Sequence, residues 1–350
     1  MAIDTLQDEA RDLLGGAVAL RRDLHRRPEV GNDLPATRER ILEEIDDLGL
    51  DVTLHESTSG IAALLTGGRP GPTILLRGDM DALPMPEQTG LEFASEVDGA
   101  MHACGHDTHV AMLSGAARLL AGRREELPGR VLFMFQPGEE GHHGARYMLD
   151  EGLLDVPPLA DGTPSPVVAA AAIHISSALP SGWVSTRRGA IMASADTLRI
   201  RVTGAGGHAS EPHRTLDPVP VACEIVQAIQ TMITRRVDVF DPAVVTVASI
   251  HAGTTDNVIP DHCDILGTIR AVSDSTRQRV HDSLKRVAEG IAAAHEATVE
   301  VEIDSGYPVT VNDPDFATFA TGVAEELLGK ERTVALPNPV MGAEDFSYVL

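Results

Sequence analysis

The chain has 350 residues, of which 43% are hydrophobic and only 3% aromatic, and its formal net charge is −24. A strongly acidic surface argues against nucleic acid and anionic membranes as partners, and few aromatic rings are left to stack on bases. The length suggests two domains. Three cysteines do not make a disulfide framework, and neither a secretory signal nor a membrane span is visible, so we expect a cytoplasmic protein.

The first half of the chain alternates between helical and strand patterns. We predict helices at 3–27, 35–48, 107–121 and 143–151, and buried strands at 60–65, 73–77, 130–136 and 167–174. Such alternation is typical of an α/β fold with a mainly parallel sheet and helices on both faces.

Polar side chains follow the ends of these strands. Asp79 and Asp81 come directly after the strand at 73–77, and His174 ends the strand at 167–174. In open α/β sheets, ligands bind at the carboxyl ends of the strands. The ordinary alternatives are an aspartate-capped turn and a solvated histidine.

The stretch 101–109 (Met-His-Ala-Cys-Gly-His-Asp-Thr-His) holds three histidines, a cysteine and an aspartate at the start of a predicted helix. Cys104 and His106 are a thiolate and imidazole pair that suits zinc, nickel or manganese-class ions. A solvated histidine cluster and a purely structural site remain alternatives. Glu139 and Glu140 follow a strand as an adjacent pair, which can place one carboxylate on a metal and the other on its water.

From about residue 189 the pattern changes to strands in which polar and apolar residues alternate, so that one face is exposed to solvent. A strand at 197–203, a helix at 216–234, strands at 243–251 and 262–272, a helix at 274–295 and a strand at 298–304 follow in order. This βαββαβ order predicts a ferredoxin-like α+β domain inserted at 189–306. Residues 1–188 and 307–350, with a predicted helix at 313–328, then form the catalytic metal-binding domain.

Eight motifs occur in a specific order along the chain. They are 24–29 (Leu-His-Arg-Arg-Pro-Glu), 77–84 (Arg-Gly-Asp-Met-Asp-Ala-Leu-Pro), 102–109 (His-Ala-Cys-Gly-His-Asp-Thr-His), 135–140 (Phe-Gln-Pro-Gly-Glu-Glu), 206–213 (Gly-Gly-His-Ala-Ser-Glu-Pro-His), 257–261 (Asn-Val-Ile-Pro-Asp), 267–270 (Gly-Thr-Ile-Arg) and 341–346 (Met-Gly-Ala-Glu-Asp-Phe). With them the chain resembles the metal-dependent amidohydrolases and peptidases related to aminoacylase and carboxypeptidase G. It is most similar to the branch of hippurate hydrolases, N-acyl-amino-acid amidohydrolases and indole-acetyl-amino-acid hydrolases.

The resemblance implies a zinc-peptidase-like fold and a role for each matching residue. The implied metal ligands are Cys104, His106, Glu140 and His174. They would hold one or two divalent ions per subunit, Zn²⁺ or Mn²⁺, with Ni²⁺ or Co²⁺ as further candidates.

The remaining implied roles concern catalysis and substrate. Glu139 matches the general acid and base, and Asp81 an aspartate that supports the metal centre. His208, Asn257 and Arg270 match residues of the inserted domain that hold the substrate. In relatives that domain forms the dimer, and the histidine that matches His208 reaches the partner subunit's active site. A homodimer, or a dimer of dimers, is therefore expected.

The expected reaction is hydrolysis of the amide bond of small N-acyl-L-amino acids, hippurate-like or N-acetylated, to a carboxylic acid and an amino acid. One alternative is a dipeptidase or carboxypeptidase of the same family. Another is a metal-binding dimer with impaired catalysis, because relatives continue beyond the motif at 341–346 and supply a last histidine ligand there. The catalytic domain is expected to be truncated at this end, whereas the presence of Glu139 favours activity.

Overall fold

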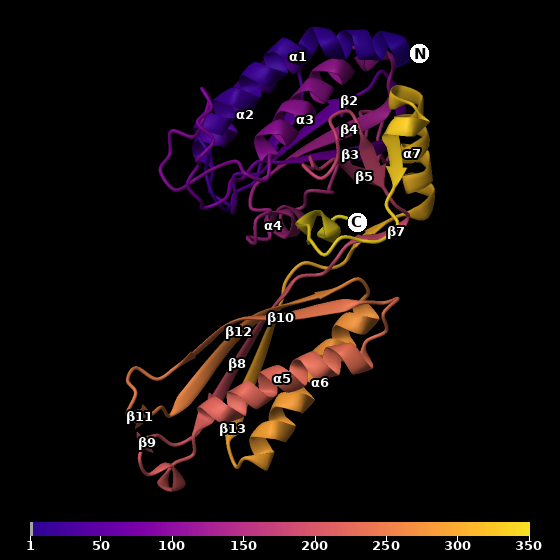
Figure 1. Ribbon diagram of the computed structural model, residues 1–350. Coiled ribbons are helices and arrows are strands. Elements are labelled where there is room, and N and C mark those ends of the chain that lie inside the picture. Colours follow the sequence, from indigo (N-terminus) through magenta and orange to yellow (C-terminus); the bar gives the residue numbers. More distant parts are fainter. Residues whose placement is uncertain (1–2) are drawn as a thin grey trace. The chain divides into compact units, whose positions relative to one another are not determined.

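The computed structural model describes residues 3–350 and divides the chain into two compact units (Figure 1). The first unit comprises residues 3–185, 320–334 and 348–350, and the second comprises 186–319 and 335–347. The insert predicted at 189–306 lies inside the second unit, which also includes the segments 307–319 and 335–347. No helix within residues 3–350 combines the length and the apolar character needed to cross a bilayer.

The first unit is an α/β layer structure around a five-stranded sheet. Its helices are α1 (Ile3–Arg26), α2 (Pro35–Ile45), α3 (His106–Ala121) and α4 (Gly144–Asp150), with short 3-10 turns at Asp46–Leu48 and Arg124–Glu126. Its strands are β1 (Asp51–Leu54), β2 (Ile61–Thr66), β3 (Arg69–Asp79), β4 (Pro128–Gln136) and β5 (Val167–Ala172), in the sheet order β1-β2-β4-β3-β5.

The α/β class is confirmed, and the sheet is mixed. Strand β3 runs parallel to β4 and β5, whereas β2 runs antiparallel to β1 and β4. The short connection at 55–60 explains part of this, because parallel neighbours need a crossover of a dozen or more residues. The parallel strands are therefore those separated by the predicted helices.

Helices cover both faces of this sheet. In Figure 1, α1, α2 and α3 lie on one side of it and α4 on the other. On β4 the side chains of Phe133 and Phe135 pack with the first three helices, while the intervening Met134 faces the other side and is also fully buried. Because successive side chains of a strand point to opposite faces, β4 is buried on both.

The strand ends set up the functional site. Asp79 of β3 pairs with Gln136 of β4, and Arg77 of β3 pairs with Ala172 of β5. The three strands therefore end at nearly the same level of the sheet, and the segments that follow them leave from one edge.

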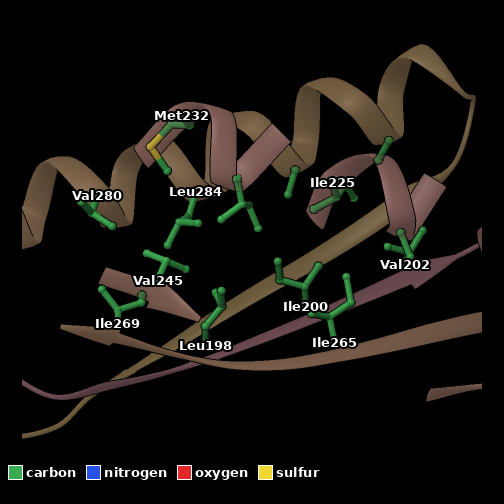
Figure 2. Packing of buried hydrophobic residues seen from close by; sticks show 14 of the residues in the cluster. Leu198, Ile200, Val202, Ile225, Met232, Val245, Ile265, Ile269, Val280 and Leu284 are labelled. Atoms are coloured by element: carbon green, nitrogen blue, oxygen red, sulfur yellow. The ribbon is translucent and has the colours of Figure 1, made fainter. Parts of the chain in front are cut away.

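The second unit is an antiparallel sheet covered by two helices. Its main strands are β8 (Asp196–Thr203), β10 (Ala243–Ala252), β12 (His262–Ala271) and β13 (Thr298–Ser305), and its helices are α5 (Pro218–Arg236) and α6 (Asp274–Ala294). The sheet order β10-β12-β8-β13 is that of a ferredoxin-like βαββαβ domain. Figure 2 shows Leu198, Ile200 and Val202 of β8 pointing toward the helices, where they pack with Ile225 and Leu284.

Smaller elements complete the chain. Strand β7 (Gly189–Met192) pairs with β14 (Thr310–Asn312), β9 (Gly207–His208) with β11 (Val258–Ile259), and β6 (Val184–Thr186) with β15 (Thr333–Ala335). Helix α7 (Pro314–Leu328) follows β14, and 3-10 turns lie at Pro212–Arg214, Lys330–Arg332 and Asp345–Tyr348.

A buried carboxylate ties the second unit together. Asp196, at the start of β8, accepts hydrogen bonds from Arg277 and His281 of α6 and from the backbone N–H of Gly306, at 3.0, 2.7 and 3.1 Å. Burial alone would raise the pKa of Asp196, but His281 and Arg277 outweigh it and hold the pKa below its usual value.

Asp196→Asn should destabilise the second unit by about 3 kcal/mol, because removing one member of a buried ion pair leaves its partners uncompensated. Since the folded-state pKa is depressed, this stability is fully present above the unfolded pKa of about 3.9 and is lost as the pH falls through the folded value. Urea unfolding at pH 7 and pH 3 measures the difference between variant and wild type. Asp264→Asn removes an exposed pair with Arg201 on the same sheet and should cost no more than about 1 kcal/mol. Equal losses in the two variants would contradict this account.

Candidate metal centre

A glycine turn brings Cys104 and His106 to the same point. Gly105 caps the start of α3 in the left-handed conformation, with φ of 90°. A Cβ at this position would lie 2.6 Å from Cγ2 of Ile175, so both the backbone conformation and the space require glycine.

His174 lies beside this turn. The predicted strand 167–174 ends at Ala172, so His174 follows the strand in an exposed segment. Its Nδ1 contacts the carbonyl oxygen of Ile175 at 2.6 Å, and its Nε2 lies 3.4 Å from Sγ of Cys104. Ligand atoms of Cys104, His106 and His174 all lie within 4.8 Å of one another. A histidine whose Nδ1 donates to a backbone carbonyl presents Nε2 to a metal, which is a common arrangement in metal sites.

The glutamate pair is held by Asp81. One oxygen of Asp81 accepts the backbone N–H of Glu139 and the other accepts that of Glu140, both at 3.0 Å. The first oxygen also lies 3.4 Å from Nδ1 of His106. Oε1 of Glu140 lies 3.9 Å from Nε2 of His106, and His106, Glu139 and Glu140 offer ligand atoms within 4.8 Å of one another. Asp81 therefore fixes the loop that carries both glutamates.

The buried carboxylates attract positive charge to this position. Burial alone would lower the pKa of His106, but the negative charges of Asp79 and Asp81 raise it to about 12. Burial raises the pKa of the Cys104 thiol and, together with Asp81 and Asp79, that of the Glu140 carboxyl. In the metal-free protein the site thus favours a protonated imidazole, and a divalent cation would supply the same compensating charge.

The donor set fits a divalent ion. Among the described residues, both ring nitrogens of His106 and Oε1 of Glu140 are buried without a hydrogen-bond partner. Buried polar atoms are usually paired, so three such atoms facing a thiol and a second imidazole call for a ligand. A thiolate, two imidazoles and a carboxylate are typical of Zn²⁺ and similar ions.

Behind this cluster lie Asp79, which the sequence placed at the end of a strand without a role, and His109, to which it assigned none. Asp79 is fully buried, 2.7 Å from Nη1 of Arg77 and 2.5 Å from Nδ1 of His109. Burial alone would raise the pKa of Asp79, but Arg77, His106 and His109 together hold it well below its usual range. The signal was available: Asp79 alternates with Asp81, and His109 lies three residues after His106, on the same helix face.

The predicted substrate residues of the second unit fall into two separate places. His208 and Asn257 are exposed neighbours, because Val258 pairs with His208 and the N–H of Ala209 donates to the carbonyl of Asn257 at 3.0 Å. Their two-stranded ribbon continues from the end of the main sheet where Thr203 pairs with His262. Arg270 is partly buried eight residues farther along β12, about 27 Å away at ~3.4 Å per residue.

Several known proteins are similar to this chain in sequence and in fold. The model of a family described as "Peptidase family M20/M25/M40" matches residues 75–350. Thermostable carboxypeptidase 1 of Saccharolobus solfataricus is 38% identical, over 99% of this chain and 86% of its own length. N-acetylcysteine deacetylase of Bacillus subtilis is 38% identical, over 94% and 84%. The crystal structure of the YXEP protein of Bacillus subtilis, a dinuclear metal-binding peptidase of family M20, has a TM-score of 0.82 and 36% identity, over 97% and 86%.

Replacing Cys104 with Ser should weaken binding of Zn²⁺ or Mn²⁺ by more than the ~10–100-fold typical of losing a supporting residue, because a hydroxyl is a poorer and harder ligand than a thiolate. Elemental analysis after dialysis, together with metal titration, gives the result. Cys223→Ser, at an exposed position of α5, is the matched control and should bind metal as wild type does. Unchanged metal content in the Cys104 variant would show that Cys104 is not a ligand.

Proposed function

We propose that this chain, which belongs to peptidase family M20/M25/M40, hydrolyses small N-acyl-L-amino acids to a carboxylic acid and an amino acid. Hydrolysis of amide bonds is the activity of the family. The observation that carries the proposal is the Glu139 and Glu140 pair, fixed on Asp81 beside Cys104, His106 and His174. The similarity to an N-acetylcysteine deacetylase supports a small acyl group.

The chemistry requires a water nucleophile, a Lewis acid and a proton carrier. A divalent ion held by Cys104, His106, Glu140 and His174 would supply the Lewis acid and lower the pKa of its water from about 15.7 toward ~7. Glu139 is buried next to Glu140 and takes a proton from the attacking water. It then donates that proton to the leaving amine nitrogen. A positioned acid and base of this kind contributes about 10²–10⁴-fold to the rate.

The substrate's two ends call for different partners. Arg270 offers a planar guanidinium that can form two parallel hydrogen bonds to an amino-acid carboxylate. His208 accepts the N–H of Ser210 on Nδ1 at 3.1 Å, which leaves its proton on Nε2 to donate to a developing oxyanion. Because about 27 Å of β12 separates this end of the sheet from Arg270, one chain cannot bring both residues to one small substrate. We therefore assign His208 and Asn257 to the active site of a partner subunit in a homodimer.

A second candidate is a carboxypeptidase or dipeptidase. The observation in its favour is the 38% identity to a thermostable carboxypeptidase over nearly the whole chain. The two activities share the metal, the proton carrier and the carboxylate-binding arginine. They differ in the group on the carbonyl side of the amide bond that is cleaved, which is a simple acyl group in one case and an amino acid or peptide in the other. Turnover of hippurate, N-acetyl amino acids and dipeptides at equal concentration separates them.

The mixed sulfur, nitrogen and oxygen donors suit Zn²⁺ or Mn²⁺. We place the enzyme in the cytoplasm, since its cysteines, at 104, 223 and 263, are all free thiols, and thiols stay reduced there.

The two glutamates should respond differently to the same substitution. Glu139→Gln keeps the size and hydrogen-bonding shape of the side chain but cannot accept a proton, so it should retain metal and fold while kcat falls by about 10²–10⁴-fold. Glu140→Gln should lose metal affinity first, with part of the rate restored by excess ion. Steady-state kinetics across a metal titration, with metal content measured in parallel, compare the two variants. An active Glu139→Gln protein, or equal metal loss in both, would overturn these roles.

The dimer can be tested by mixing inactive variants. Glu139→Gln and His208→Ala chains should each be inactive alone, while a mixed dimer keeps one site with both residues intact. After exchange of subunits the mixture should recover about a quarter of wild-type activity, since half of the dimers are mixed and each has one working site. Light scattering at micromolar concentration checks the assembly. A monomer, or no recovery on mixing, would refute the shared site.

A further inference from the structure

We propose that His109 is a positioning residue of the metal centre that holds the His174 segment in place through the backbone amide of Ile175. The inference rests on the proposed function only in taking His174 as a metal ligand. It assigns to His109 a role that is distinct from ligation, although the residue lies among the candidate ligands.

His109 lies between two of these ligands. It is 1% exposed, one turn after His106 on α3. Its ring stacks on His106 at a centroid distance of 5.4 Å and meets the ring of His174 edge-on at 4.7 Å. By position alone, Asp79, His106 and His109 could form a second group of ligands.

Both ring nitrogens of His109 are already engaged. Its Nδ1 lies 2.5 Å from Oδ1 of Asp79, and its Nε2 lies 2.8 Å from the backbone nitrogen of Ile175. A backbone N–H can only donate, so Nε2 must accept and the ring proton must be on Nδ1, where it donates to the Asp79 carboxylate. This neutral tautomer has no lone pair left for a metal. The geometry therefore assigns His109 to support and not to ligation.

Ile175 passes this constraint on to His174. The N–H of Ile175 is held by His109, while its carbonyl oxygen contacts Nδ1 of His174 at 2.6 Å. The Ile175 side chain also packs against Gly105, between Cys104 and His106. The segment has left the ladder of β5 and is exposed, so these contacts take the place of strand pairing.

The other end of the network is anchored in the sheet. Asp79 contacts Arg77, and Nε of Arg77 donates to Oε1 of Gln136 on the neighbouring strand at 2.7 Å. All three side chains are buried. The orientation of His174 is thus set by a chain of contacts that begins on β4 and passes through Asp79, His109 and Ile175. Such supporting residues typically affect metal affinity by about 10–100-fold.

Two substitutions of His109 each remove the hydrogen bond of one ring nitrogen and can retain that of the other. In His109→Gln, the amide oxygen can occupy the place of Nε2 and accept from Ile175, while the bond to Asp79 is lost. In His109→Asn, the amide nitrogen can occupy the place of Nδ1 and donate to Asp79, while the N–H of Ile175 is left without its acceptor. The proposal requires that Gln preserve function better than Asn, although both remove the imidazole.

Two measurements avoid any dependence on substrate. In the metal-free protein, hydrogen exchange of a peptide covering 173–177 should stay close to wild type in His109→Gln and become faster in His109→Asn. Titration with Mn²⁺ alone should show an affinity loss of roughly 10–100-fold in His109→Asn and a smaller one, under about tenfold, in His109→Gln. Circular dichroism of both metal-free variants checks that they fold. These results stand even if wild type hydrolyses no acyl amino acid, so failure here is distinct from failure of the proposed function.

If neither variant folds, substitutions of the exposed residue Ile175 test the same hydrogen bond. Ile175→Pro removes the N–H that His109 accepts, and Ile175→Ala keeps it while removing the side chain. Only Ile175→Pro should lower Mn²⁺ affinity by the roughly 10–100-fold expected of His109→Asn. Equal losses in His109→Gln and His109→Asn, or in Ile175→Pro and Ile175→Ala, would overturn the proposal. Loss of a whole equivalent of bound metal in both His109 variants would instead identify His109 as a ligand.

Discussion

The buried negative charge at the end of β3 is the constraint on which the site depends. Asp79 and Asp81 are almost completely buried, and a buried carboxylate is costly unless it is paired and hydrogen-bonded. Asp81 meets this need with two backbone N–H groups, which fixes the glutamate pair. Asp79 meets it with Arg77 and His109. Together Asp79 and Asp81 raise the pKa of His106 to about 12. The charges that fix the loops therefore also favour a cation at this position.

Each unit has its own hydrophobic core. In the first unit, the candidate metal cluster lies on segments that follow three neighbouring strands, and the core packs one face of their sheet against α1, α2 and α3. The second has its own core between two helices and one face of its sheet, closed by the buried contacts of Asp196. Of its predicted substrate residues, Arg270 lies near the end of β12, whereas His208 and Asn257 lie in the β9 and β11 ribbon beyond the start of that strand.

Much of this architecture was predictable from sequence because it is local. Apolar periodicity located the seven α-helices and the eight predicted strands within about four residues, and the βαββαβ order indicated the ferredoxin-like class. It did not find β1 or the short strands β6, β7, β9, β11, β14 and β15. The direction of β2 was not predictable in this way, since the choice of neighbour in a sheet depends on long-range pairing. The end of β5 was also misplaced by two residues, because the apolar run Val-Val-Ala-Ala-Ala-Ala-Ile continues past the last pairing at Ala172.

The stretch 101–109 shows most clearly where sequence information ends. By itself the sequence determined which residue types gather there, their position at the start of a helix, and the family they indicate. The pairing with Cys104 and the resemblance to the family pointed to His106 as the ligand among the three histidines. The residue pattern could not assign their protonation states and hydrogen bonds, because these depend on the partners that the fold supplies. His102 is buried without a hydrogen-bond partner among the described residues, and burial lowers its pKa to about 4. His109 has both ring nitrogens engaged, by β3 and by the segment after β5. His106, beside the glutamates, has no hydrogen-bond partner for either ring nitrogen within residues 3–350. Only the tertiary structure decided these differences, since each partner comes from a distant part of the chain.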